Sequence, residues 1–420
     1  MIRRYLQDQI MISLKYFPVV LLTGARQVGK STLAQSLIGT SWQATYFTLD
    51  DRLTLDAALK DPDGFIKGIP TPAVIDEVQK APDLLRAIKR AVDRNRKAGQ
   101  FLLTGSANIM TLTSVSETLA GRIALHTLHP FCWPEFLKKP LPKILNDLLK
   151  ETDSKKLLKA YPQTASKDYK TQLIETILRG GYPPASLMDS EVARRQWFSS
   201  YRQTYIERDL LNIKAIENLP DFNRLISLTA LRSGRLLNLS DFSRETGLPF
   251  TTLRRYMNLL EITYQVFFIR PYFSHLGKRI IKTPKLYFND TGMACHLIGV
   301  YDWQTIENQG FAGYIVETWV ASELQKLISV LNTQHNLYFW RTHTGHEVDF
   351  LVERAGKLVA IEVKWGQRID ERSIKNLNRL AEDLRDKLVF SILLYSGDEV
   401  IPLHPQAVAM PFPIFFGISS

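Results

Sequence analysis

The chain has 420 residues and a mass of 48.1 kDa, which is too long for a single hydrophobic core, so we expect about two to four domains. Its composition, 45% hydrophobic and 23% charged, is typical of a folded soluble protein, and no apolar stretch is long enough to span a bilayer. The 53 Lys and Arg against 42 Asp and Glu give a net charge of +11, which favours phosphate-rich partners without proving one. Two distant cysteines argue against a disulfide framework or a zinc site, and the absence of a signal-like segment predicts a cytoplasmic protein without a membrane partner.

The first informative stretch is VVLLTGARQVGKST, residues 19–32. Its apolar start has the form of a buried parallel strand, and the residues that follow fit G-x-x-x-x-G-K-[ST]. The glycines let backbone N–H groups point at phosphate oxygens, Lys30 supplies a cation for the β and γ phosphates, and the Ser31 hydroxyl can coordinate Mg²⁺. The loop predicts ATP binding, with a helix over 32–38 behind it and contacts from Gly24, Ala25, Arg26, Gln27, Val28, Gly29, Lys30, Ser31 and Thr32.

Such a site needs a carboxylate on a neighbouring strand to hold the metal ion. Two strand-like runs end in acidic residues, the first in Asp50 and Asp51 and the second in Asp76 and Glu77. The second run follows a further helix-like segment and pairs Asp with Glu. We therefore predict that Asp76 binds Mg²⁺ through water and that Glu77 polarises the attacking water, with Asp50 and Asp51 as the alternative pair.

An amphipathic helix is predicted over 83–98, followed by a buried strand over 100–104 that ends in Gly-Ser-Ala-Asn. A polar residue at the tip of a strand between the loop strand and the Asp-Glu strand can sense the γ phosphate. Thr104 and Ser106 are the candidates. The alternative, that they are helix caps or turn formers, stays open.

These motifs together resemble one group of prokaryotic AAA+-type ATPases, and the resemblance covers most of the chain. It is carried by GARQVGKST, VIDEVQ, LLTGSAN and LAGR, and further along by GGYP at 180–183 and YIERDL at 205–210. In that group a P-loop domain is followed by a C-terminal domain related to restriction endonucleases. The resemblance implies an α/β fold, with a parallel sheet covered by helices on both faces, and ATPase activity.

The same resemblance implies a phosphate-sensing or trans-acting role for Arg122, and a structural arginine at a helix end is the alternative. A homo-oligomer is compatible with the resemblance. The sequence contains no convincing second sensor arginine of the usual AAA+ type, so a hexamer-style mechanism is not predicted.

Composition divides the chain into four predicted parts. Residues 138–170 are rich in Lys, Pro, Asp, Ser and Thr, which is typical of an exposed connection. We predict an AAA+-type ATPase domain over 1–160, a helical lid or connector over 161–220, a winged helix-turn-helix over 221–272 and a nuclease-like domain over 273–420.

The winged helix-turn-helix is predicted from LSDFSRETGLPFTTLRRYMNLLEITYQVFFI, residues 239–269. Ser240 can cap a helix that Gly247 stops, a second helix runs from Thr251 or Thr252 to Leu260, and β-rich sequence follows. Between residues 240 and 285, eight Lys and Arg oppose three Asp and Glu, with Arg254 and Arg255 away from the apolar face. The segment predicts DNA binding, and the alternative is a packing module between domains.

A second informative stretch, HEVDFLVERAGKLVAIEVKWG at 346–366, alternates apolar and polar residues on both sides of an Ala-Gly turn. If facing positions sum to 711, one hairpin face is wholly apolar, and a slip of one residue would scatter it. The predicted pairs are Val348 with Val363, Phe350 with Ile361, Val352 with Val359, Glu347 with Lys364 and Asp349 with Glu362.

Directly opposed carboxylates repel each other, and a divalent cation between Asp349 and Glu362 would remove that repulsion, because oxygen ligands suit Mg²⁺ or Mn²⁺. Lys364 leaves the same face and could orient or deprotonate a water. The spacing is that of PD-(D/E)XK nucleases, although Val348 stands where the motif name has proline. Resemblance adds Glu317, on a helix expected over 311–331, as a helping carboxylate, and the alternative is a solvated charged face.

His343 and His346 precede the first predicted strand of this hairpin and lack the spacing of a zinc motif, so substrate contact or solvation is the better interpretation. The sequence as a whole predicts an ATP-hydrolysing protein that acts on DNA, with Lys30, Glu77, Lys364 and Glu317 in catalytic roles and Ser31, Asp76, Asp349 and Glu362 as metal ligands. The rival hypothesis is a nucleotide-gated DNA- or protein-binding switch whose C-terminal domain is catalytically inert. A small-molecule P-loop kinase is a weaker third, because it leaves the residues after 220 unexplained.

Overall fold

The computed structural model describes residues 2–39, 41–105, 119–150, 154–166, 168–207, 216, 218–275, 277, 279, 282–331 and 334–418. The chain forms two compact units. The first consists of Met1–Phe131 with Leu259–Gln265, and the second of Cys132–Asn258 with Val266–Ser420. The four-part division expected from the sequence is finer than these two units and stays a prediction.

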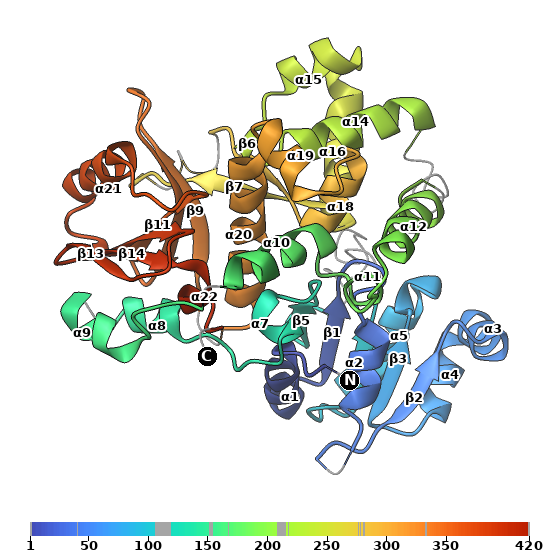
Figure 1. Cartoon of the computed structure of the whole chain (residues 1–420). Coiled ribbons are helices and arrows are strands. Elements are labelled where there is room, and N and C mark those ends of the chain that lie inside the picture. Colours follow the sequence, from blue (N-terminus) through green and yellow to red (C-terminus); the bar gives the residue numbers. More distant parts are fainter. Residues whose placement is uncertain are drawn as a thin grey trace. The chain divides into compact units, whose positions relative to one another are not determined.

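The first unit is built around a five-stranded parallel sheet in the order β2-β3-β4-β1-β5 (Figure 1). Its strands are β1 (Val19–Thr23), β2 (Thr45–Thr48), β3 (Ala73–Asp76), β4 (Phe101–Thr104) and β5 (Ile123–Thr127). Its helices are α1 (Leu6–Tyr16), α2 (Lys30–Ser36), α3 (Arg52–Lys60), α4 (Pro62–Gly68), the 3₁₀ turn η1 (Val78–Lys80) and α5 (Leu84–Arg94). The predicted α/β fold with a parallel sheet is thus confirmed.

The strand order explains why helices cover both faces of this sheet. The chain passes from β1, next to the edge strand β5, to the opposite edge strand β2 through α2, and then returns through α3 and α4 to β3 and through α5 to β4. Right-handed crossovers that run in opposite directions along a sheet place their helices on opposite faces. The strands are parallel, so the carboxyl ends of β1, β3 and β4 lie side by side at the same end of the sheet, which we call the carboxyl edge.

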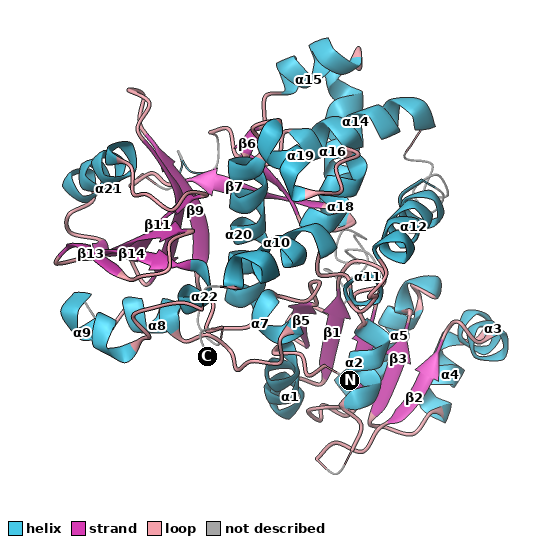
Figure 2. Ribbon diagram, viewed as in Figure 1, coloured by secondary structure: helices cyan, strands magenta, loops and turns pink. Residues whose placement is uncertain are grey.

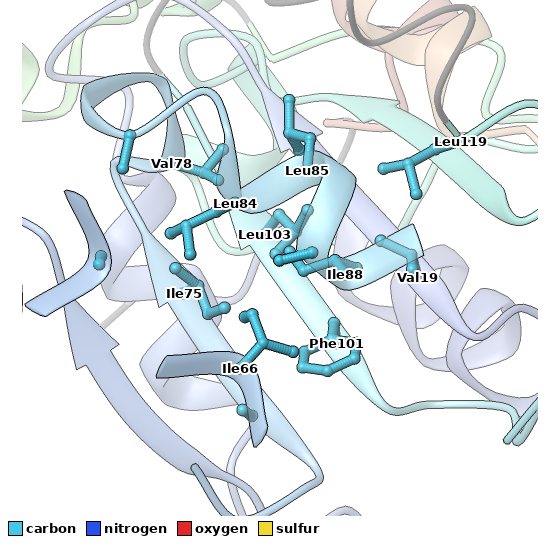
Figure 3. Close-up of a cluster of buried hydrophobic side chains, with 14 of the residues drawn as sticks. Val19, Ile66, Ile75, Val78, Leu84, Leu85, Ile88, Phe101, Leu103 and Leu119 are labelled. Atoms are coloured by element: carbon cyan, nitrogen blue, oxygen red, sulfur yellow. The ribbon is translucent and has the colours of Figure 1, made fainter. Parts of the chain in front are cut away.

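One face of the sheet is sealed by α5. Figure 3 shows Leu84, Leu85 and Ile88 of this helix together with strand residues such as Ile75 and Leu103, all of them buried. Alternate residues of each strand point to the same face, which is why these strand positions share one cluster. The packing holds the strand ends that carry the polar residues of the site.

The second unit contains a nine-stranded mixed sheet in the order β13-β14-β12-β11-β10-β9-β7-β8-β6 (Figure 2). Its strands are β6 (Arg235–Leu236), β7 (Val266–Pro271), β8 (Lys285–Phe288), β9 (Asn336–Arg341), β10 (Glu347–Arg354), β11 (Lys357–Lys364), β12 (Leu388–Tyr395), β13 (Ile401–His404) and β14 (Ala407–Pro411). In the described part of the chain, no helix is both long and apolar enough to cross a membrane.

The helices between these strands fall into three groups. Before the first strand lie α7 (Trp133–Phe136), α8 (Ile144–Leu148), α9 (Ser154–Ala160), α10 (Tyr169–Arg179), α11 (Pro183–Ser186), α12 (Glu191–Tyr201), the π-helical turn η3 (Arg202–Glu207) and α14 (Leu219–Leu231). Between β6 and β7 lie α15 (Leu239–Thr246) and α16 (Phe250–Ile262). Later in the chain come α18 (Thr291–Leu297), α19 (Trp303–Asn308), α20 (Ala312–Ser329), α21 (Glu371–Asp383) and α22 (Phe412–Phe415).

The segment predicted as helix-turn-helix forms two helices and then strands. Gly247 ends α15 with a φ of +74°, a backbone conformation that glycine adopts without steric cost. The predicted Ser240 cap is wrong, because the side chain of Asn238 accepts a hydrogen bond from the Ser240 N–H and caps the helix instead. Strands β7 and β8 pair antiparallel, and β6 extends them along the other edge of β8.

The predicted hairpin is formed by β10 and β11 in the predicted register, with Phe350 opposite Ile361 and Val352 opposite Val359. Ala355 and Gly356 form the turn with φ values of +50° and +81°, as a tight two-residue hairpin connection requires. The apolar face is buried as expected, so the hydrophobic alternation fixed the pairing of the strands.

We expect Leu103→Ala to destabilise the first unit by about 2–5 kcal/mol, because the side chain is fully buried against α5 and its loss leaves a cavity. Leu53→Ala is the matched control: Leu53 is 79% exposed, and its truncation should change the free energy of unfolding by less than about 0.5 kcal/mol. Denaturant titrations of both variants provide the comparison. Equal midpoints would contradict the packing described for this face.

Candidate functional site

The loop between β1 and α2 has the backbone shape expected of a phosphate cradle. Gly24 has a φ of +143°, and a Cβ atom at this position would lie 2.3 Å from the carbonyl oxygen of Leu128. Glycine is therefore required at this position for both conformation and space. Val28 is buried, while Arg26 and Gln27 are exposed at the turn of the loop, and Gln27 has a φ of +65°.

Lys30 is folded against its own loop. Its ammonium group donates hydrogen bonds to the carbonyl oxygens of Gly24 at 3.2 Å and Ala25 at 2.8 Å, and its side chain is only 5% exposed. Burial lowers the pKa of Lys30 to about 8, although the nearby carboxylates of Glu77 and Asp76 act in the opposite direction. The Lys30 ammonium group is thus shielded from water, and in this environment it would interact strongly with a phosphate.

Asp76 is the acceptor around which the other polar groups of the strand edge gather. One oxygen accepts from the Ser31 hydroxyl at 3.0 Å and from the Thr104 hydroxyl, and the other accepts from the Tyr46 hydroxyl at 2.8 Å. Burial, together with the hydrogen bond to Asp76, raises the pKa of Tyr46. The structure therefore brings the loop serine and the predicted carboxylate together, which is the donor set that suits Mg²⁺.

Glu77 follows β3 in a left-handed conformation, with a φ of +59°, and its carboxylate accepts from the amide of Gln79. Its N–H donates to the Thr104 hydroxyl at 3.2 Å. Thr104, one of the two predicted sensor residues, thus links the ends of β3 and β4. The other, Ser106, lies outside the described residues.

The alternative acidic pair has other partners. Asp51 caps α3 by accepting from the Thr54 N–H, and Asp50 forms an ion pair with Lys80 at 2.6 Å. Neither carboxylate has an interaction with the loop in the hydrogen bonds and ion pairs of the described residues. This placement favours Asp76 and Glu77 over the alternative.

Arg122 lies at the start of β5, and its carbonyl oxygen accepts from the N–H of Val19 at the start of β1. The phosphate loop follows the other end of β1, so Arg122 is at the opposite edge of the sheet. Its side chain forms an ion pair with Asp93 at 2.5 Å and donates to the Ala120 carbonyl. This geometry does not favour a contact between Arg122 and a phosphate bound in the same chain; its trans-acting role stays a prediction.

Sequence reasoning missed three residues that hold this edge. The buried Arg4 donates to the carbonyl oxygens of Val28 at 3.0 Å and His129 at 2.6 Å, and so fastens the loop from outside the motif. Tyr264 donates its hydroxyl proton to Thr23, at the end of β1, over 2.9 Å, and Tyr46 bonds to Asp76. None of the three stands in a sequence motif, so nothing in the sequence pattern marked them.

The second unit contains a cluster of partly to fully buried charged residues that we call the acidic cluster. Glu317 comes from α20, Glu347 and Asp349 from β10, and Glu362 from β11. The Val363 N–H donates to an Asp349 oxygen at 2.9 Å, and Lys364 lies 3.5 Å from Glu362. The structure therefore brings together all four of the residues predicted for this site, Glu317, Asp349, Glu362 and Lys364.

A cation that the sequence analysis did not single out, Lys285 at the start of β8, lies within the acidic cluster. Its ammonium nitrogen is 2.9 Å from Glu317, 2.6 Å from Glu347 and 3.8 Å from Asp349. Glu347 therefore forms an ion pair with Lys285, whereas the hairpin register had predicted only that Lys364 stands opposite it on β11. The register is confirmed from Phe350–Ile361 to Arg354–Lys357, and the cation comes from β8, which β9 and β7 separate from β10 in the sheet.

Burial and the mutual repulsion of the carboxylates shift the pKa values of the acidic cluster. Burial, and then the charge of Glu317, raise the pKa of Asp349 to about 7, and burial together with the charge of Asp349 raises the pKa of Glu362 well above its usual value. Burial alone would lower the pKa of Lys285, but Glu317, Asp349 and Glu347 raise it well above its usual value. Tyr287 donates to Glu317 at 2.7 Å.

Asp349 and Glu362 have the chemistry of divalent-metal ligands. Glu362 is 3% exposed, and its Oε2 atom is buried without a hydrogen-bond partner, which is costly for a carboxylate oxygen unless a cation or proton compensates it. Glu317 and Glu347, however, are already bonded to Lys285. Across the described ranges, no three His, Cys, Asp or Glu residues are placed so that they could hold a metal ion.

A cavity of about 850 Å³, which we call the basic cavity, adjoins the acidic cluster. Lys285 and Glu347 line it, as do Phe250 and Arg254 from the first two turns of α16. Five cations and two carboxylates are among its lining residues: Arg232, Arg235, Arg254, Lys285 and Arg341 against Asp241 and Glu347. The cavity therefore suits an anionic ligand.

Three family models match separate parts of the chain. Residues 16–137 match the model described as AAA domain, residues 170–304 match Domain of unknown function (DUF8612), and residues 312–415 match Domain of unknown function (DUF4143). The AAA match covers the sheet and loop of the first unit, and supports nucleotide binding and hydrolysis there.

Two mycobacterial proteins, Uncharacterized protein Rv2008c of Mycobacterium tuberculosis and Uncharacterized protein Mb2031c of Mycobacterium bovis, are each 31% identical over 396 residues, which is 94% of this chain and 80% of theirs. Uncharacterized protein MJ1544 of Methanocaldococcus jannaschii is 24% identical over 405 residues, 92% of this chain and 85% of its own. Among solved structures, the Walker-type ATPase paby2304 of Pyrococcus abyssi aligns with a TM-score of 0.44 and 15% identity over 71% of this chain and 96% of its own, a likeness too low to support a conclusion.

The affinity for ATP should fall as the pH rises through about 8, because the free Lys30 ammonium loses its proton there and a neutral amine attracts phosphate poorly. Below that pH the side chain is charged and the affinity should be constant. Titration with a fluorescent ATP analogue, from neutral pH to about pH 9, measures the effect. Lys30→Arg is the control, since a guanidinium keeps its charge, and its affinity should be lower but independent of pH. A wild-type affinity that does not change across this range would contradict the buried, easily deprotonated lysine.

Proposed function

The chain belongs to the family of AAA-domain proteins that includes Rv2008c, and from that premise we propose that it uses ATP in its first unit to govern an action of its second unit on DNA. The second unit, in this proposal, holds a winged helix-turn-helix formed by α15, α16 and the strands that follow, and a PD-(D/E)XK nuclease-like domain around β10 and β11. The observation that carries the proposal is the basic cavity lying directly against the acidic cluster, with Lys285 and Glu347 shared by both.

The nucleotide chemistry is assigned to the edge of the parallel sheet. Lys30 would exchange its loop carbonyls for the β and γ phosphates of ATP, while the loop N–H groups and the N-terminus of α2 hold the same anion. Ser31 and Asp76 would hold Mg²⁺, which shields the phosphate charge. Glu77 would polarise the attacking water, with Thr104 fixing its backbone.

The binding of DNA is assigned to the basic cavity. Arginine guanidinium groups bind phosphates through paired hydrogen bonds, and the cavity presents four of them. Phe250 and Arg254 belong to the start of the second helix of the helix-turn-helix, the part that contacts nucleic acid in that motif. An anion drawn into this cavity lies beside the carboxylates and not far from a metal ion that they would hold.

For phosphodiester hydrolysis, Asp349 and Glu362 would hold a divalent cation, Mg²⁺ or Mn²⁺, and Glu317 would help. That ion would supply charge stabilisation and a more acidic bound water. Lys364 lies 3.5 Å from Glu362, whose charge helps to raise the pKa of Lys364 against the effect of burial, so its ammonium group would orient a water by donating to it. Asp349 is kept in place by the Val363 N–H, so its orientation does not depend on the metal ion.

A second function has an observation of its own. Lys285 already neutralises Glu317 and Glu347, as an ion pair can do in a domain that has lost catalysis. The protein would then be a nucleotide-gated switch, with the basic cavity used to bind DNA or an acidic protein and the acidic cluster kept for structure. A homo-oligomer, with Arg122 acting across its interface, is compatible with either function.

Duplex DNA should bind with an affinity that falls by about 0.9 log unit per log unit of salt for each phosphate contact, because bound counterions are released. Arg254→Ala should weaken binding and reduce this slope by about one, since it removes one phosphate contact at the basic cavity. Arg379→Ala is the matched control, because Arg379 is an exposed arginine on α21 that does not line the cavity. Fluorescence anisotropy over a salt series measures both. A salt-independent affinity, or an equal loss in the two variants, would contradict binding at this cavity.

A further inference from the structure

Lys285 stands at the boundary between the basic cavity and the acidic cluster. Its side chain is almost fully buried, its ammonium nitrogen is within 2.9 Å of two carboxylates, and it also lines the cavity. Glu347 has the same double position: it pairs with Lys285 on one side and lies 3.6 Å from Arg341 of the cavity on the other. The two residues connect an anion-binding surface to a cation-binding one.

Removal of the Lys285 ammonium group from the acidic cluster would leave the surrounding carboxylates without a counter-ion. Glu317, Glu347 and Asp349 are gathered around one ammonium group, and a buried carboxylate that loses its counter-ion is strongly destabilising. A departing ammonium must therefore be replaced by another cation. The buried Oε2 atom of Glu362 lacks a hydrogen-bond partner and would be a ligand for such a cation.

Lysine is suited to an exchange of this kind. Its ammonium group is a compact point charge on a flexible chain, and its partners are the carboxylates of the acidic cluster, whereas two other cations of the cavity have partners outside that cluster. Arg232 pairs with Glu245, and Arg235 lies over the ring of Tyr314 at 4.6 Å. Lys285 is the cavity cation whose movement would free carboxylates for a metal ion.

We propose that Lys285 is an internal counter-cation of the acidic cluster, which a divalent metal ion replaces when the ammonium group moves to a phosphate of a nucleic acid in the basic cavity. This inference rests on the proposed action on DNA and adds its regulation. Metal ions and nucleic acid then bind cooperatively, and each raises the affinity for the other by the same factor. In the absence of nucleic acid, the cluster has low affinity for metal ions.

The test is calorimetric titration of the full-length protein with Mn²⁺ in the absence of DNA. Lys285→Met should bind Mn²⁺ with a Kd at least about tenfold lower than the wild type, since the site no longer spends most of its time occupied by the ammonium group. Lys326→Met is the matched control: Lys326 is a buried lysine on α20, paired with Glu323 at 2.8 Å, away from the cluster. Its Kd for Mn²⁺ should equal that of the wild type. Adding Asp349→Asn to Lys285→Met should abolish the gain.

A second measurement needs no variant at Lys285 and decides the matter if that variant does not fold. Wild-type protein is titrated with Mn²⁺ in the presence of a short duplex whose linkages are phosphorothioates, and the Kd should fall relative to that without duplex. Tight Mn²⁺ binding by the wild type alone, unchanged by the duplex or by Lys285→Met, would overturn the role of Lys285 while leaving the metal site intact. Absence of Mn²⁺ binding in the wild type, the variant and the duplex mixture would overturn both the role of Lys285 and the proposed metal site.

Discussion

The contact between Lys285 and the carboxylates of α20 and β10 underlies the functions proposed for the second unit. Three partly buried carboxylates and the buried Glu362 on β11 lie close together, an arrangement that a positive charge stabilises. In the structure that charge comes from the first residue of β8. The same residue lines the basic cavity, so any anion that attracts it changes the electrostatics of the acidic cluster. The proposed cleavage, the alternative of inert binding and the proposed metal uptake all depend on where the charge of Lys285 lies.

The first unit also contains a buried carboxylate, and hydrogen bonds stabilise it. Asp76 is buried at the end of β3, and three hydroxyl groups from three different elements, Ser31, Tyr46 and Thr104, donate to it. The charge of Asp76 raises the pKa of Lys30 against the larger effect of burial, but the Lys30 ammonium group donates its hydrogen bonds to carbonyl oxygens of the loop. The parallel sheet makes this possible, because it aligns the carboxyl ends of β1, β3 and β4 at one edge. Residues of the AAA domain that lie far apart in the sequence are thus brought together at the place where the proposed nucleotide and its metal ion would bind.

The sequence predicted the local features that depend on spacing and alternation. The phosphate loop, the strand that carries Asp76 and the register of the β10–β11 hairpin follow from short-range patterns, and the structure contains them. What could not be predicted depends on elements distant in the chain: Lys285 reaches Glu347 because β8 and β10 share a sheet, and Arg4 reaches Val28 because α1 packs beside β1. The Ser240 cap failed for a local reason, since Asn238 competes for the same helix end and is an equally good cap.

The central claim, that ATP in the first unit governs metal-dependent cleavage by the second, is tested most directly by incubating the purified protein with DNA. Linear duplex, circular duplex and single-stranded DNA are each tested with Mg²⁺ or Mn²⁺, with and without ATP, alongside Lys364→Ala. The account predicts that the wild type cleaves at least one substrate, that Lys364→Ala does not, and that ATP changes the rate. No cleavage of any substrate would contradict the nuclease and leave the nucleotide-gated switch, with Lys285 as a permanent part of the acidic cluster.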